Sequence, residues 1–128
     1  MFNFKLYHKP SLLAFPVLAA YERKDCYFCR VAPWNWLDNE HIVIEDPHAP
    51  RMITMDPWPQ LIFLDAVGKL TVAGYVDYMA HRYKRNTPEK LDATIIEELE
   101  KLVQNKLVIL SEQPILLDPR HDQPYKPH

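Results

Sequence analysis

Between His41 and Asp118 the chain alternates short β-rich runs with segments of helical spacing, and this order constrains its fold more than any other feature. Two β-rich runs come first, three helical segments of rising length follow, and two short apolar runs close the series. Each segment has an apolar face that it must bury against another segment. The order therefore predicts an α+β domain with an N-terminal β-hairpin, three helices and a small C-terminal hairpin.

The N-terminal hairpin is predicted from residues 41–45 and 51–55, which are rich in β-branched and other apolar side chains. The five residues between these runs, 46–50, include two prolines and an aspartate. Such residues end one strand and start the next. We therefore expect two antiparallel strands with a five-residue connection.

Three helices are predicted from capping residues and apolar spacing. The first begins after Asp56 with Pro57 in its first turn and ends at Gly68. Thr71 is the expected N-cap of the second helix, and residues 87–89 (Thr-Pro-Glu) are the expected start of the third. The third helix has the clearest apolar stripe, formed by Leu91, Ile95, Leu99, Leu102 and Val103, with Ile96 beside it.

The remaining parts of the chain divide it into three regions. Residues 107–110 and 114–118 are apolar runs around a polar connection, which predicts the small closing hairpin. We place the domain at residues 40–118 and expect an extended, proline-rich tail at 119–128. Residues 1–39 show no sustained period of 2 or 3.6, so we expect an irregular, aromatic-rich segment packed on the domain and completing its core.

The segment order resembles that of winged-helix domains, which bind either DNA or peptides. Winged-helix DNA readers carry basic residues on the third helix. Here the stretch from Thr87 to Lys106 has five acidic residues against three lysines, and the whole chain has a formal net charge of -2. These charges would repel phosphates and favour a peptide or protein partner over nucleic acid. A DNA-binding transcriptional regulator, with the basic run 82–85 against the backbone, is the alternative.

The chain from His41 to Leu110 also resembles the PqqD-like family, small winged-helix peptide chaperones also called RiPP recognition elements. The resemblance lies in the run 55–58, in an aspartate and a glycine that close a short helix, and in a Thr-Val helix start. Asp65, Gly68, Thr71 and Val72 occupy those places. The chain departs from the family at Lys106, where a glycine is usual, and in its long N-terminal segment.

The resemblance implies a non-catalytic module that presents a precursor peptide to a peptide-modifying enzyme. In the family, a leader peptide adds as a strand to the edge of the N-terminal hairpin and packs against the third helix. Proline at Ile53 would then block binding, provided that the Ile53 amide faces the open edge. The peptide-binding residues implied for this chain are Arg51, Met52, Ile53, Thr54, Met55, Ile96, Leu99, Glu100 and Val103.

Other chemistry finds little support in the sequence. Cys26 and Cys29 form a single C-x-x-C motif without a second pair of ligands, so we expect free thiols, no metal and no cofactor. No nucleophile with a matching base and no phosphate-binding glycine loop is evident, so we expect no enzyme activity. The apolar run 12–20 makes a poor signal sequence because Pro16 interrupts it, and no run is long enough for a membrane span.

These features predict a cytoplasmic protein. A structural, self-associating subunit is the third alternative, in which the tail and the N-terminal segment exchange between copies of a homo-oligomer.

Overall fold

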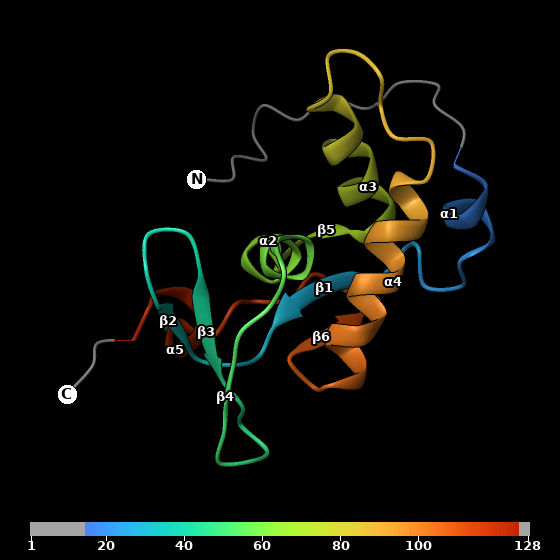
Figure 1. Ribbon diagram of the computed structural model, residues 1–128. Coiled ribbons are helices and arrows are strands. Elements are labelled where there is room, and N and C mark those ends of the chain that lie inside the picture. The colour runs from blue at the N-terminus through green and yellow to red at the C-terminus, as the bar shows by residue number, and fades with distance from the viewer. Residues whose placement is uncertain (1–14, 126–128) are drawn as a thin grey trace.

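The computed structural model describes residues 15–125 and has a mixed α+β architecture, with two small antiparallel sheets and five helices among those residues (Figure 1). The α+β fold class is confirmed. In chain order the elements are α1 (Pro16–Ala20), β1 (Tyr27–Arg30), β2 (Trp34–Trp36), β3 (Ile42–Glu45), β4 (Met52–Ile53), α2 (Pro57–Asp65), β5 (Val67–Thr71), α3 (Val72–His81), α4 (Leu91–Gln104), β6 (Val108–Ser111) and α5 (Pro119–Asp122).

The first sheet has the order β5-β1-β6, with β1 in the middle and antiparallel to both neighbours. Its central strand comes from the N-terminal segment, so the prediction that residues 1–39 are irregular is wrong at this point. Phe28, Cys29 and Arg30 are all buried, and β1 therefore shows no alternation of buried and exposed residues. A strand covered on both faces lacks the period-2 pattern by which strands are predicted.

The second sheet has the order β2-β3-β4 and contains the predicted hairpin. Strands β3 and β4 are antiparallel, with Ile44 opposite Ile53 and Glu45 opposite Met52. The hairpin is confirmed, although β4 has two residues where five were predicted. Strand β2 pairs with the other side of β3 and brings Trp34 opposite Ile44, so the N-terminal segment contributes to both sheets.

The helices α2 and α3 begin where their caps predict. Pro57 opens α2, and the Thr71 side chain accepts a hydrogen bond of 3.0 Å from the Gly74 backbone N–H at the start of α3. The end of α2 differs, because the helix stops at Asp65 and residues 67–71 form β5. Gly68 has the positive φ expected of a helix-ending glycine, +80°, but lies within that strand.

Helix α4 is confirmed as the longest helix of residues 15–125, but it starts at Leu91 and not at 87–89. The Leu91 N–H donates to the carbonyl of Pro88, so the chain makes a turn before the helix begins. The apolar stripe of α4 forms a large part of the core, with Leu91, Ile95 and Leu99 each no more than 1% exposed. Helices α2 and α3 pack against this face from the other side of the core (Figure 1).

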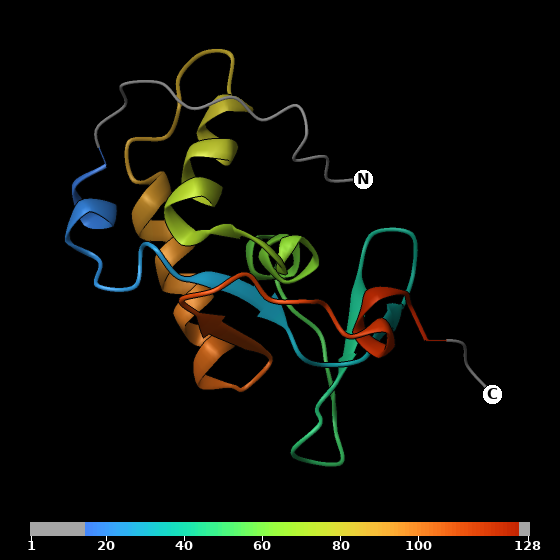
Figure 2. The ribbon, with the colours of Figure 1, turned by 180° about the vertical axis from the view of Figure 1, so that it is seen from behind.

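The C-terminal part differs most from its prediction. Residues 114–118 form no strand, because β1 already pairs with β6 and the Ile115 N–H instead donates to the Gly68 carbonyl on β5, at 3.0 Å. The predicted C-terminal hairpin is therefore wrong. The chain then crosses to α5, a helical turn beside β2 that is capped by Asp118 through the Arg120 N–H at 2.8 Å (Figure 2). A fully extended tail is thus wrong at residues 119–122.

Candidate functional site

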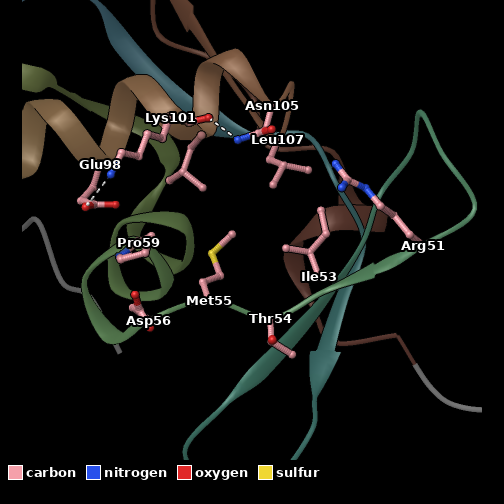
Figure 3. Close-up of a pocket in the computed structure, with 11 residues that line it drawn as sticks. Arg51, Ile53, Thr54, Met55, Asp56, Pro59, Glu98, Lys101, Asn105 and Leu107 are labelled. Atoms are coloured by element: carbon pink, nitrogen blue, oxygen red, sulfur yellow. Dashed lines mark hydrogen bonds and ion pairs between the residues drawn. The ribbon is translucent and has the colours of Figure 1, made fainter.

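A cavity of about 540 Å³ opens between the end of the predicted hairpin and the C-terminal half of α4 (Figure 3). We call it the β4–α4 groove. One wall consists of residues 51 and 53–56 with Pro59 from α2, and the other consists of side chains from α4 together with Leu107. The groove thus forms where residues near 53 and residues near 102 meet, although about fifty positions separate them in the chain.

The strand wall of the groove contains Arg51, Ile53, Thr54 and Met55, which are four of the five hairpin residues implied by the family resemblance. Ile53 and Met55 are half-buried and pack against the core. Alternate residues of a strand point to the same side, so Arg51 lies on the same side as these two. Met52, the fifth implied residue, does not line the groove and has a side chain that is 53% exposed.

The direction of the backbone groups along β4 follows from the hydrogen bonds at its ends. The Asp46 N–H donates to the Arg51 carbonyl at 3.1 Å, which makes these residues a hydrogen-bonded pair. Hydrogen-bonded and non-hydrogen-bonded pairs alternate in an antiparallel ladder, so Ile53 bonds to β3 and Met52 does not. The Glu45 N–H, opposite Met52, donates to the Pro33 carbonyl at 2.9 Å, on the β2 side. The N–H and C=O of Met52 therefore face away from β3.

The outer edge of β4 carries no further strand among residues 15–125, because β4 is the last strand in the order β2-β3-β4. An edge strand presents unpaired backbone donors and acceptors, which makes it a template for pairing with another chain. In this molecule that edge borders the groove (Figure 3).

The helix wall of the groove consists of Glu98, Lys101, Leu102 and Asn105. Lys101 and Leu102 are neighbours, and each lies three or four positions from Glu98 and from Asn105, so the four residues share one side of α4. Leu102 and Leu107 are buried, with exposed fractions of 3% and 1%, and they provide an apolar base between polar rims.

The four helix residues implied by the family resemblance do not line the groove. Ile96 and Leu99 are buried in the core, with exposed fractions of 8% and 1%, and Val103 is half-buried and packs against it. Glu100 lies on a different face of α4 from Lys101. The spacing of Glu98, Lys101 and Asn105 around Leu102 was the signal in the sequence that could have identified this wall.

Glu100 is covered by the N-terminal segment. Arg23 Nη2 donates to both Glu100 carboxylate oxygens, at 2.6 and 2.7 Å, and the Tyr21 hydroxyl donates to one of them. Burial and the neighbouring Glu100 carboxylate raise the pKa of Tyr21 above its ordinary value. Near the N-terminus of α4, buried Asp92 accepts a hydrogen bond from the Leu18 backbone N–H at 3.0 Å. Helix α1 and the residues that follow it therefore cover this face of α4 and leave the groove face open.

The groove has opposite charges at its two ends. Arg51 lies at one end, where its Nε donates to the buried carboxylate of Asp46 at 2.7 Å. This contact and the His48 backbone N–H lower the pKa of Asp46. Asp56 and Glu98 lie at the other end, where Lys101 is ion-paired with Glu98, so two carboxylates there accompany one lysine (Figure 3).

A buried arginine and a buried carboxyl lie away from the groove. Arg30, only 4% exposed, directs its guanidinium at backbone carbonyls, with bonds of 2.7 Å to Leu64, 2.7 Å to His121 and 3.0 Å to Asp122. Asp65 accepts a hydrogen bond of 2.7 Å from the Tyr75 hydroxyl. Burial raises the pKa of Asp65, and the Tyr75 hydrogen bond opposes that effect. These contacts are structural ties within the core.

The cysteines and other potential ligands form no metal cluster in the described part of the chain. Cys26 is half-buried, Cys29 is buried, and neither forms a disulfide. Burial raises the pKa of the Cys29 thiol, which disfavours the reactive thiolate. Among residues 15–125, no group of three or more His, Cys, Asp or Glu side chains lies close enough to hold a metal ion.

No model of a known protein family matches the chain, and no curated protein or solved structure is significantly similar to it. None of the helices in residues 15–125 has the length and apolar character needed to cross a lipid bilayer. The function is therefore inferred from the groove and the strand edge beside it.

Proposed function

We propose that this protein is a non-catalytic module that binds an extended segment of a peptide or partner protein by strand addition to β4. The observation that carries the proposal is the open edge of β4 beside a groove with an apolar base. In strand addition, main-chain hydrogen bonds contribute affinity and side-chain pockets contribute selectivity. Met52 supplies the outward backbone groups, and Leu102 and Leu107 supply the apolar surface.

A winged-helix arrangement of the PqqD type is part of this proposal. The succession α2-β5-α3-α4-β6 supports it, as does the position of the groove between a hairpin edge and the third long helix. In a winged helix, the strand after the third helix pairs with a second strand to form the wing. Here β1 pairs with β6 and takes the place of that second strand. In this proposal the protein works in the cytoplasm and delivers a bound precursor peptide to a peptide-modifying enzyme.

The charge of α4 supports a peptide ligand over DNA. The groove face of the helix carries Glu98 beside Lys101, and Glu97 is also within 3.6 Å of that lysine. The face that includes Asp92 and Glu100 is covered by the N-terminal segment. A helix that reads the major groove needs a free face with basic residues.

The proposal is tested with a proline at position 52. Peptides are first selected from a random display library on the full-length protein, and their affinities are then measured by calorimetry. Met52→Pro removes the outward N–H, so we expect affinity to fall by about tenfold, equivalent to one net hydrogen bond. The substitution should spare the hairpin, since the Met52 N–H is not bonded to β3.

A control variant makes the result specific. Met52→Ala keeps the backbone N–H and should retain most of the affinity. Ile53→Pro is unsuitable, because the register places that amide toward β3 and not toward the open edge. Equal binding by Met52→Pro and the unchanged protein, or an absence of selected peptides, would reject strand addition to β4.

A further inference from the structure

We infer that the segment bound in the groove is bipolar, with an acidic side chain at one end, a basic side chain at the other and an apolar side chain between them on the same face. This inference rests on the proposed function and specifies its ligand. It follows from the ends of the groove, where Arg51 and Asn105 lie opposite Asp56 and Glu98, with Ile53 between (Figure 3).

The cationic end of the groove is fixed in place. The Arg51 side chain is 59% exposed, but its Nε is held by Asp46, whose side chain is only 4% exposed. Neither Nη group of Arg51 makes a hydrogen bond to another described residue. A guanidinium anchored on one side and open on the other can receive a carboxylate with two parallel hydrogen bonds.

The acidic end of the groove contains a carboxylate that makes no hydrogen bond or ion pair to another residue in the range 15–125. Asp56 is the N-cap of α2, yet its side chain makes no capping hydrogen bond. Within residues 15–125, none of the side chains bonds to or ion-pairs with the Asp56 carboxylate. Glu98 lies at the same end and is ion-paired with Lys101, whose Nζ lies 3.4 Å away, so Asp56 is the carboxylate that this lysine does not pair with. A cationic side chain is the complementary ligand here.

The spacing between the two ends sets the sequence of the ligand. The strand wall runs from residue 51 to residue 55, although β4 itself covers only Met52–Ile53. Five residues of an extended ligand span roughly 13 Å, at about 3.3 Å per residue. Side chains at positions i, i+2 and i+4 of a paired strand point to the same face. The first and last of these would meet the charged ends, and the middle one would lie over Ile53, Leu102 and Leu107.

Selection from a random twelve-residue display library tests this composition. On the unchanged full-length protein, we expect enrichment of peptides with an acidic and a basic residue about four positions apart around an apolar residue. Selection is then repeated with Arg51→Gln, which keeps a donor for Asp46, and with Asp56→Asn, which has nearly the same shape and removes only the charge. Arg51→Gln should abolish the acidic preference, and Asp56→Asn should abolish the basic one.

Matched substitutions outside the groove serve as controls. Lys69→Gln and Glu112→Gln remove the same charges at exposed positions that do not line the groove, and they should leave both preferences unchanged. For one selected peptide, Arg51→Gln and Asp56→Asn should each weaken binding by about tenfold, and the controls by less than about twofold.

The outcomes separate this inference from the proposed function. Peptides that depend on the Met52 N–H but show no charge preference would overturn the bipolar ligand and leave strand addition intact. A charge preference that survives both groove substitutions would also overturn it. If no selected peptide bound Met52→Pro more weakly than the unchanged protein, the proposed function itself would be rejected.

Discussion

Asp65 shows how one residue combines a predicted and an unpredicted property. The family resemblance places it at the close of a short helix, and α2 does end at Asp65. Its burial, with only 8% of the residue exposed, includes the packing of Tyr75 from α3 against it. That packing brings the Tyr75 hydroxyl within 2.7 Å of its carboxylate, across ten positions of the chain. Local spacing cannot predict such a contact.

The raised pKa of Asp65 has a defined effect on stability. A carboxyl whose pKa is higher in the folded protein than in the unfolded chain favours folding while it is protonated. This contribution is complete below the ordinary pKa of aspartate, about 3.9, and is lost as pH rises through the raised value. Asp65 therefore opposes folding in its ionised form, even with the Tyr75 hydrogen bond in place.

Asp65→Asn should remove this pH dependence, since an amide oxygen still accepts from the Tyr75 hydroxyl and carries no charge. Relative to the unchanged protein, we expect its free energy of unfolding to increase from about pH 4 toward neutral pH, by on the order of 1 kcal/mol. Urea unfolding at a series of pH values measures the difference. The exposed control Asp25→Asn should stay within about 0.5 kcal/mol throughout. Parallel curves for Asp65→Asn and the unchanged protein would contradict the assignment.

The elements differ in how far the sequence predicts them. Pro57 in the first turn of α2, the N-cap Thr71 and the apolar stripe of α4 are local signals, and the helices that they predict are present. Strands β1 and β6 pair over about eighty positions, so nothing near Phe28 in the sequence indicates its partner. The same long-range pairing explains the missing C-terminal hairpin, since β1 occupies the place beside β6.

The groove repeats this contrast between local and long-range features. Its strand wall lies on the hairpin, a local unit that the sequence predicts, and the family resemblance implied a binding edge there. The helix residues implied by the family resemblance lie on other faces of α4 than the groove, and the contacts of Tyr21 and Arg23 with Glu100 could not be predicted from spacing. The core side of an amphipathic helix is predictable, whereas the division of its polar side between partners is not.

Gly68 tests the contact between β5 and the segment that follows β6. Its φ of +80° is unfavourable for other residues, and a Cβ at this position would lie 2.1 Å from the Ile115 carbonyl oxygen. Gly68→Ala should therefore lower the free energy of unfolding by about 2 kcal/mol or more, as measured by urea denaturation. Gly74→Ala, in an ordinary helical position with the nearest atom at 3.2 Å, should change it by less than about 1 kcal/mol. If both variants lost similar amounts of unfolding free energy, the close approach of Ile115 would not be the reason that position 68 requires glycine.

At the scale of the whole molecule, α5 connects the two sheets. The His121 carbonyl accepts from Arg30 Nε on β1 at 2.7 Å and from Trp34 Nε1 on β2 at 3.0 Å. The Arg30 guanidinium also lies 5.7 Å from the centre of the Trp34 ring. One backbone carbonyl thus joins the central strand of the first sheet to a strand of the sheet that carries the groove wall. The C-terminal segment is therefore expected to fix the position of β4 relative to α4.

Removing residues 119–128 should test this connection, because it deletes two of the three carbonyls that satisfy the Arg30 guanidinium. We expect the free energy of unfolding to fall by about 1–3 kcal/mol. Peptide affinity should fall as well, although α5 does not line the groove. Urea denaturation and calorimetry measure the two effects. Removal of residues 126–128 alone, which leaves the His121 and Asp122 carbonyls in place, is the matched control.

A double-mutant cycle then assigns the effect to Arg30. Arg30→Lys keeps the positive charge, but a single ammonium group cannot reproduce the planar fork that reaches three carbonyls. In the full-length protein this substitution should cost about 1–3 kcal/mol. In the chain shortened after Asp118 it should cost less, since the carbonyls of His121 and Asp122 are already gone. Strictly additive losses of stability would mean that α5 stabilises the fold through contacts other than those with Arg30. Arg30 would then not connect the C-terminal segment to the groove.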